Sequence, residues 1–186
     1  MTGEPRDLAS LRAALTAGWR PKFQFFWSHE TRAARIGAEC LSQWYLAPFE
    51  VEGRRFETAE HYMMHAKALL FHDEEIAERI LEVTHPGEAK KLGRLVENFD
   101  GAVWERRRED IVLAGNLAKF RAHPELREVL LRTGERLLVE ASPVDRIWGI
   151  GLAADDPLAE HPLGWRGLNL LGFALMRVRA TLREQG

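Results

Sequence analysis

A carboxylate and an amine stand seven residues apart in a segment that contains neither Gly nor Pro. Glu60 and Lys67 lie in residues 58–71, which we expect to form a helix. Seven residues is close to two helical turns, so both side chains project from one face, with Met63 and Met64 between them. A carboxylate in an apolar setting must be paired, and such groups often act as acids or bases. The simpler interpretation is a solvent-exposed acid and base on an amphipathic helix.

A second candidate site follows a predicted strand. Residues 140–151 read Glu-Ala-Ser-Pro-Val-Asp-Arg-Ile-Trp-Gly-Ile-Gly, so Asp145, Trp148 and two glycines share one short loop. Glycine lets a backbone approach a ligand closely, and this composition suits a ligand cradle. The loop is not a dinucleotide fingerprint, because the G-x-G-x-x-G spacing into a helix is absent. The chain also has no P-loop, no G-x-S-x-G nucleophile elbow and no cysteine-centred nucleophile signature.

Metal chemistry has one candidate pair of ligands. His61 and His65 are spaced i, i+4 on the predicted helix and could present two imidazoles to one metal ion. The catalytic metalloprotease pattern needs a Glu directly after the first His, where this chain has Tyr62. The one cysteine, Cys40, excludes an internal disulfide and a multi-cysteine zinc site. We therefore expect neither a metal nor a cofactor.

The charge balance narrows the classes of partner. Lys and Arg number 26 against 28 Asp and Glu, for a net charge of −2, which argues against a strongly basic nucleic-acid domain. The basic run at residues 106–108 is flanked by acids and reads as a solvated helix face. No apolar segment resembles a secretion signal or approaches the roughly 20 residues of a membrane span. We expect a cytoplasmic protein that binds no membrane.

The elements that must position these residues are mostly helical. At 186 residues and 46% hydrophobic composition, we expect a single α+β domain, predominantly helical with a small antiparallel sheet. Residues 1–20 read as an N-terminal helical extension and residues 21–183 as the domain. Strands are expected near 22–27, 51–56 and 137–140, and helices over 58–71, 73–81, 84–93, 104–120, 124–131 and 168–182. The expected inward positions of the longest helix are Val103, Ile111, Leu113, Leu117 and Phe120.

Taken together, these segments resemble the NADAR (YbiA-like) family from about Phe25 to Arg179. Each piece is weak alone, but in this order and spacing the pieces are highly specific. The matching stretches are Phe25-Phe26-Trp27, Leu41 to Tyr45 with Pro48-Phe49, Thr58 to Met64 with Lys67, Lys91 to Arg94, Trp104, Gly115 to Phe120, Leu131 to Gly134, Leu138 to Glu140, Ser142-Pro143, Asp145-Arg146, Trp148 to Gly151, Gly167 to Asn169 and Leu171-Gly172.

The resemblance implies an N-glycosidase. Characterised members hydrolyse the C–N bond of phosphoribosylamino-pyrimidines, the reactive early intermediates of riboflavin biosynthesis, and release ribose 5-phosphate. Other members are linked to removal of ADP-ribose from guanine bases. The family pattern implicates an acid, a Trp and an Asp in activity, and these match Glu60, Trp104 and Asp145.

The expected chemistry fits these residue types. Cleavage of an N-riboside passes through an oxocarbenium-like sugar, and a nearby carboxylate stabilises the positive charge that builds at C1. We assign Glu60 and Asp145 as catalytic, without dividing the roles between them. The expected substrate-binding residues are Trp104, Trp148, Lys67, Arg94 and Asn169. Trp104 or Trp148 would stack on the base, and Lys67 and Arg94 would bind the phosphate or tune the pKa of Glu60. Many relatives carry Asn-Arg-Leu-Gly where this chain has residues 169–172 as Asn-Leu-Leu-Gly. Any phosphate contact made by that Arg is therefore lost in this chain or is supplied by Arg166.

Two alternatives stay open. The chain could hydrolyse ADP-ribosyl-guanine in DNA, which requires a basic groove that the balanced charge disfavours. It could also be a non-catalytic module that binds NAD or ADP-ribose, which would not need both carboxylates. The expected partner is a small phosphorylated N-riboside, with nucleic acid only under the first alternative. The sequence assigns no oligomeric state.

Overall fold

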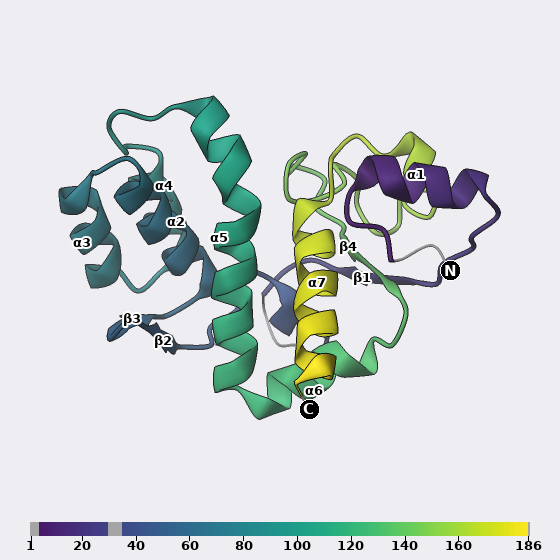
Figure 1. The fold of residues 1–186 in the computed structure, drawn as a ribbon, viewed down its shortest axis with the longest axis horizontal. Coiled ribbons are helices and arrows are strands. Elements are labelled where there is room, and N and C mark those ends of the chain that lie inside the picture. Colours follow the sequence, from purple (N-terminus) through teal and green to yellow (C-terminus); the bar gives the residue numbers. More distant parts are fainter. Residues whose placement is uncertain (1–3, 30–34, 186) are drawn as a thin grey trace. The chain divides into compact units, whose positions relative to one another are not determined.

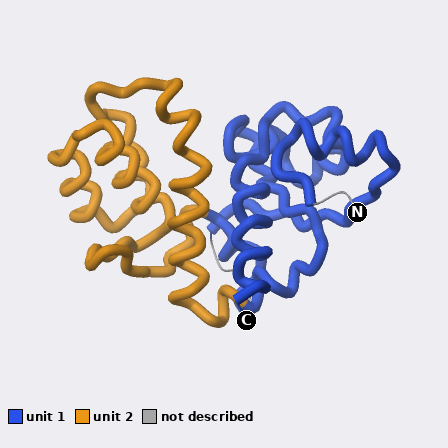
Figure 2. The backbone as a smooth tube through the Cα atoms, in the orientation of Figure 1, with its two compact units in different colours: residues 1–42, 128–186 blue, residues 43–127 orange. Residues whose placement is uncertain are grey.

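Helices dominate the structure, and its few strands form two small sheets. The structure is a computed structural model that describes residues 4–29 and 35–185. Two compact units make up the chain (Figure 2): unit 1 is Met1–Ser42 with Glu128–Gly186, and unit 2 is Gln43–Arg127. The predominantly helical α+β class predicted from the sequence is confirmed. The boundary that we placed between residues 20 and 21 stays a prediction.

Unit 2 holds a hairpin and most of the helices. The hairpin turns at Glu52 and Gly53, which both have positive φ (51° and 75°), as a tight two-residue turn requires. The two strands of this hairpin pair in the antiparallel direction. The elements of unit 2 are β2 (Phe49–Val51), β3 (Arg54–Phe56), α2 (Ala59–Leu70), α3 (Glu74–Glu82), α4 (Pro86–Gly93) and α5 (Gly101–Ala122) (Figure 1).

Side-chain caps fix where the unit 2 helices begin. The Asp100 carboxylate accepts hydrogen bonds from the backbone N–H groups of Ala102 (2.8 Å) and Val103 (3.0 Å), which starts α5 and places Trp104 in its first turn. Asp73 caps α3, and its other oxygen accepts from the backbone N–H of Glu97 at 2.9 Å. The segment between α4 and α5 is therefore anchored at Glu97 and at Asp100.

Two glycines bring α2 close to its neighbours. A Cβ at Gly93 of α4 would lie 2.1 Å from Met64 Sδ, and a Cβ at Gly115 of α5 would lie 2.4 Å from Tyr62 Cδ1. Neither position can carry a side chain unless Met64 or Tyr62 of α2 moves, so both glycines allow the helices to pack closely. Helix α2 thus packs against both α4 and α5.

The buried face of α5 differs from the predicted one. Among the expected inward residues only Phe120 is buried, whereas Val103, Ile111, Leu113 and Leu117 are half-buried. The prediction followed apolar residues alone, and polar residues occupy part of the buried face instead. The buried residues of α5 are Val112, Gly115, Asn116, Lys119 and Phe120.

Unit 1 contains a parallel pair of strands covered by the last helix. Strands β1 (Phe23–Phe26) and β4 (Leu137–Glu140) pair in parallel, with Phe23 opposite Leu137, so the predicted antiparallel arrangement holds only for β2–β3. A parallel pair needs a long crossover, which residues 27–136 supply. The other elements are α1 (Leu8–Thr16), η1 (Ala38–Leu41), α6 (Pro124–Arg132, which begins in unit 2), η2 (Pro162–Gly164) and α7 (Leu170–Glu184). Within the described residues, no helix is both long and apolar enough to cross a membrane.

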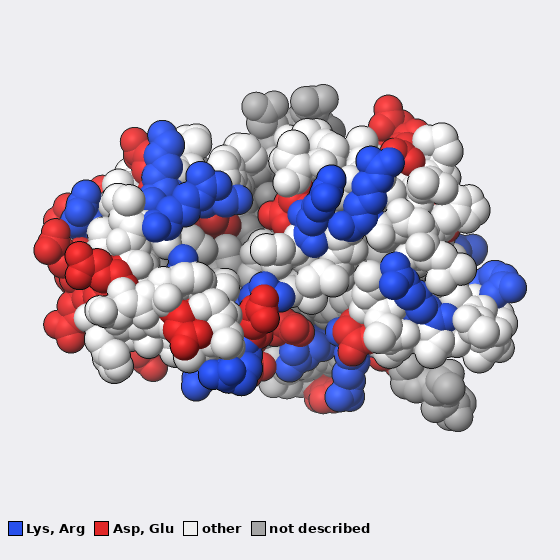
Figure 3. All heavy atoms as spheres, turned by 90° about the horizontal axis from the view of Figure 1, so that it is seen from above, with Lys and Arg blue, Asp and Glu red and all other residues white. Residues whose placement is uncertain are grey.

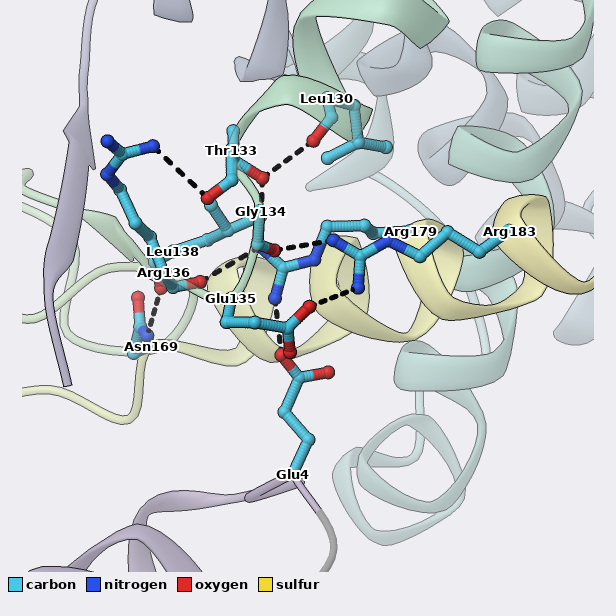
Figure 4. A network of polar contacts seen from close by, with 10 residues as sticks. All are labelled: Glu4, Leu130, Thr133, Gly134, Glu135, Arg136, Leu138, Asn169, Arg179 and Arg183. Carbon is cyan, nitrogen blue, oxygen red and sulfur yellow. Dashed lines mark hydrogen bonds and ion pairs between the residues drawn. The ribbon is translucent and has the colours of Figure 1, made fainter.

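Arg179 of α7 is fully buried and forms an ion pair with the N-terminal segment (Figure 4). Arg179 donates hydrogen bonds from Nη1 to Thr133 Oγ1 (2.8 Å) and to the Arg136 carbonyl (2.9 Å), and Nη2 forms an ion pair with Glu4. Burial lowers the pKa of Arg179, and the Glu4 carboxylate opposes that effect. Leu11 of α1 is also fully buried. The segment predicted as an extension therefore contributes to the core of unit 1.

The Glu4→Gln substitution should destabilise the protein measurably. It leaves the buried Arg179 charge without its carboxylate, and we expect the free energy of unfolding to fall by about 2 kcal/mol. Glu135→Gln is the matched control, because Glu135 pairs with Arg183 of the same helix but is 84% exposed. Such a surface pair contributes less than about 1 kcal/mol. Urea denaturation measures both variants, and equal losses would contradict the buried role of Glu4.

Candidate functional site

Glu60 lies in the first turn of α2 and is buried. Glu60 is only 3% exposed, which excludes the interpretation that it is a solvent-exposed acid on an amphipathic helix. Its backbone N–H donates to the Gln43 carbonyl at 3.0 Å, and Thr58 caps the helix just before it. A buried carboxylate is costly unless its surroundings stabilise the charge, so its position suits a functional group.

Lys67 lies in the last turn of α2, half-buried between two aromatic rings. Its Nζ donates to the Gly93 carbonyl at 2.6 Å and lies 4.3 Å from the ring centroid of Phe99 and 5.8 Å from that of Trp104. Gly93 ends α4, where the helix dipole favours a cation. Burial lowers the pKa of Lys67. Seven residues of helix separate it from Glu60, or about 10 Å along the axis.

Two further predicted residues belong to this part of unit 2. Trp104 is half-buried in the first turn of α5, and Arg94 is exposed directly after Gly93. The structure thus places Trp104 near Lys67, with Arg94 next to the residue that Lys67 contacts. Phe99 was not predicted, although its position one residue before the cap Asp100 could have marked it as part of the same turn.

Buried polar residues accompany Glu60, and sequence reasoning did not assign them to the site. Asn116 Nδ2 donates to Gln43 Oε1 at 2.7 Å, and the Gln43 backbone holds Glu60. Lys119 is fully buried, with its Nζ 5.6 Å from the ring centroid of Tyr45. Asn116 and Lys119 appeared only as parts of the Gly115 to Phe120 motif. A completely buried lysine is uncommon away from functional sites, so this motif was the available signal.

Asp145 organises the loop that carries it in unit 1. Its Oδ1 accepts from the backbone N–H groups of Ile147 and Trp148, both at 2.8 Å, and its own N–H donates to Ser142 Oγ at 3.2 Å. This is an Asx turn, which fixes the loop backbone. In the part of the chain that the structure describes, Oδ2 accepts no hydrogen bond. One oxygen is therefore structural and the other is available for chemistry.

Glycines allow the Asp145 loop to contact the loop before α7. A Cβ at Gly167 would lie 2.3 Å from the Gly149 carbonyl, and the backbone N–H of Asn169 donates to that same carbonyl at 3.1 Å. The predicted ligand cradle is thus filled in part by the protein's own backbone. Trp148 is half-buried in this loop, and its carbonyl accepts from Leu171 of α7 at 3.1 Å.

Asn169 connects α7 to strand β4. It is fully buried with a left-handed backbone (φ 56°), and its Nδ2 donates to the Leu138 carbonyl at 2.9 Å (Figure 4). Its Oδ1 accepts from the backbone N–H of Glu140 at 3.0 Å. Both polar atoms are engaged with β4, which supports a positioning role. The predicted substrate contact of Asn169 stays a prediction.

Comparisons with known proteins place this geometry in a family. The NADAR domain family matches residues 25–183. This chain belongs to the NADAR family. "N-glycosidase R617" of Acanthamoeba polyphaga mimivirus is 41% identical over 163 residues, which is 85% of this chain and 95% of that protein. "N-glycosidase YbiA" of Escherichia coli K12 is 35% identical over 135 residues, 73% of this chain and 76% of that one. The NMR structure of E. coli YbiA matches with a TM-score of 0.69 and 29% identity, covering 90% and 88% of the two chains.

The NADAR match spans both compact units and every predicted site residue. Unit 2 carries Glu60, Lys67, Arg94 and Trp104, and unit 1 carries Asp145, Trp148 and Asn169. Charge on the surface agrees with the sequence analysis. Arg106 and Arg107 are exposed, as a solvated face requires, whereas Arg108 is half-buried. Acidic and basic side chains lie close together in many places on the face shown in Figure 3.

The two histidines of helix α2 are both buried. His61 Nδ1 hydrogen-bonds with Thr58 Oγ1 at 2.8 Å, and His65 packs edge-to-face on Phe56, with 5.2 Å between ring centroids. Within residues 4–29 and 35–185, no three His, Cys, Asp or Glu side chains form a potential metal site. Burial lowers the pKa of both histidines, and for His65 the nearby Arg54 lowers it further while Glu78 raises it.

We expect stability to fall on mild acidification because of these histidines. Their pKa values in the folded protein lie below the ordinary value of 6.5, so the unfolded chain binds more protons between the two values. Their contribution to the free energy of unfolding is complete above pH 6.5 and is lost as the pH falls below that value. His65→Gln should therefore reduce the loss of unfolding free energy between pH 7.5 and 5.

The matched control is His72→Asn. His72 is exposed and has a left-handed backbone (φ 59°), which Asn tolerates. Carboxylates titrate equally in both variants, so the difference between their urea-denaturation profiles isolates His65. Identical pH profiles for the His65 variant and the wild type would contradict the prediction.

Proposed function

We propose that this chain hydrolyses the C–N glycosidic bond of phosphoribosylamino-pyrimidine intermediates of riboflavin biosynthesis and releases ribose 5-phosphate. Membership of the NADAR family and relatives named N-glycosidases support the broader activity, that of a hydrolase acting on N-glycosyl compounds. The observation that carries the substrate class is the half-buried Lys67 ammonium beside Trp104. Biosynthetic intermediates of this kind also suit the cytoplasmic location expected from the sequence.

The surroundings of Lys67 favour a phosphorylated ligand with a flat base. Within the described part of the chain, no carboxylate lies in ion-pair distance of Lys67, so its charge is balanced only by the Gly93 carbonyl and aromatic faces. A phosphate monoester supplies the missing negative charge, and exposed Arg94 adds a second cation nearby. Trp104 offers an aromatic face to a pyrimidine, a contact worth roughly 1–3 kcal/mol.

The proposed reaction uses carboxylates to stabilise a positively charged sugar. The C1–N bond breaks, and a water oxygen bonds to C1. A proton from that water is transferred to the nitrogen of the departing base. Buried Glu60 and the Oδ2 atom of Asp145 are the proposed stabilising or water-orienting groups. Lys67, two turns from Glu60 on the same helix, would hold the phosphate while Glu60 acts at C1.

A substrate panel tests the proposal directly. The purified chain is incubated with the two phosphoribosylamino-pyrimidines, their dephosphorylated ribosides, NAD, ADP-ribose and DNA that carries ADP-ribosyl-guanine, and release of sugar or base is measured. We expect cleavage of the phosphoribosides, with kcat/KM at least ~10-fold lower for the dephosphorylated forms, equivalent to about 1.4 kcal/mol.

Each other outcome overturns part of the proposal. Equal cleavage of both forms removes the phosphate role of Lys67 and Arg94. Cleavage of the modified DNA alone replaces the substrate with ADP-ribosyl-guanine. Binding of NAD or ADP-ribose without any cleavage leaves a non-catalytic binding module.

A further inference from the structure

Phe99 connects the buried part of unit 2 to the Lys67 ammonium. Its ring packs edge-to-face on Phe71, with 5.1 Å between centroids, and Phe71 is buried. Phe99 itself is 49% exposed, and Lys67 Nζ lies 4.3 Å from its ring centroid. The ring therefore packs against the core through Phe71 and also contacts the half-buried ammonium of Lys67.

The ammonium of Lys67 is held in one place with donors to spare. An ammonium has three N–H donors, and the Gly93 carbonyl accepts from one of them at 2.6 Å. The rings of Phe99 and Trp104 attract the cation but accept no conventional hydrogen bond. The other two N–H donors of Lys67 can thus bind an anion while its hydrogen bond to Gly93 is kept.

We propose that Phe99 is a positioning residue for an anionic subsite centred on Lys67, and that this subsite takes a phosphate monoester. The cation–π contact fixes the direction of an otherwise flexible side chain, so that less conformational entropy is lost when phosphate binds. A sugar hydroxyl in the same place gains less, because it carries no charge for the ammonium. The subsite thereby selects phosphorylated over unphosphorylated ribosides, which rests on the proposed function.

Hydrogen bonds on both sides of Phe99 restrain the segment that carries it. Asp100 caps α5 on one side, and on the other the backbone N–H of Glu97 donates to the α3 cap Asp73 at 2.9 Å. Between them Asn98 takes a left-handed backbone (φ 53°), which turns the chain before the aromatic ring. Phe99 thus stands in a short, doubly anchored connection.

Calorimetric titration of the full chain with ribose 5-phosphate and with ribose tests the subsite without requiring catalysis. We expect Phe99→Leu to weaken ribose 5-phosphate binding by about 3- to 30-fold, the range of a cation–π contact, and Phe99→Tyr to restore most of it. In the Lys67→Met background, Phe99→Leu should add little, because both changes remove the same contact. Leu95→Ala is the matched control, an exposed apolar residue of the same segment.

The kinetic counterpart is a rise in KM for the phosphorylated riboside, with a much smaller fall in kcat. Unchanged ribose 5-phosphate binding by Phe99→Leu, or losses that add fully to those of Lys67→Met, would refute the subsite. So would an equal loss with Leu95→Ala, which indicates a general effect on folding. A chain that binds ribose 5-phosphate through Phe99 but cleaves no member of the substrate panel refutes the proposed function alone.

Discussion

The Glu60→Gln variant should retain substrate binding and lose about 10²–10⁴-fold in kcat, the usual scale for acid–base groups. Gln has the shape of Glu but carries no charge, so it cannot stabilise an oxocarbenium-like sugar or accept a proton from water. Because Gln keeps the shape of the buried Glu60 side chain, we expect the melting temperature of the variant to change little. Single-turnover kinetics on a phosphoribosylamino-pyrimidine measure the chemical step.

The control for this variant is Glu75→Gln. Glu75 is an exposed acid in the first turn of the neighbouring helix α3 and forms an ion pair with Arg79. Both variants remove one negative charge from a helix in unit 2, so any general effect of charge on the protein appears in both. Near wild-type kcat for Glu60→Gln at saturating substrate would make Glu60 a structural residue.

Helix positions were predictable where a local signal marks the start of a helix. Asp100 and Asp73 each accept backbone N–H groups two or three residues ahead, and these contacts depend only on neighbouring residues. The helix predicted from residue 73 therefore agrees with α3, whereas α5 begins at Gly101, three residues before the predicted start at Trp104. The turn at Glu52 and Gly53 depends on a local signal of the same kind, because a tight hairpin needs positive φ, which glycine adopts readily.

Long-range features were not predictable from one sequence. The parallel pairing of β1 with β4 depends on the path of more than one hundred intervening residues, which no local pattern encodes. Lys119 and Asn116 are fully buried on α5, although lysine and asparagine are mostly exposed in proteins. Phe99 likewise joined the site through Phe71 and Lys67, which are distant in the sequence.

The Asp145 loop shows how a predicted residue can carry an unpredicted geometry. Its composition indicated a site, but the Asx turn formed by Oδ1 and the contact between Gly149 and Gly167 depend on the folded backbone. A structural role and a chemical role therefore coexist in one side chain. Substitutions that preserve one role and remove the other can separate them.

Asp145→Asn and Asp145→Ala provide that separation. Asn keeps an oxygen that can accept the N–H groups of Ile147 and Trp148, so the turn survives while the charge is lost. Ala removes both. If the carboxylate acts on the transition state, Asn alone should lower kcat by about 10²–10⁴-fold and leave the melting temperature close to wild type. Ala should be equally inactive and, in addition, less stable by about 1 kcal/mol, because two backbone donors lose their acceptor.

The contrast between the two variants decides the role of Asp145. Activity retained by Asn but lost by Ala would mean that Asp145 only shapes the loop that holds Trp148. If both carboxylates act as one unit, combining Asp145→Asn with Glu60→Gln should be far less than multiplicatively worse than either change alone. Fully multiplicative losses would instead mean independent contributions. Should both single variants keep near wild-type kcat, hydrolysis does not depend on these carboxylates, and the binding-module alternative replaces the proposed function.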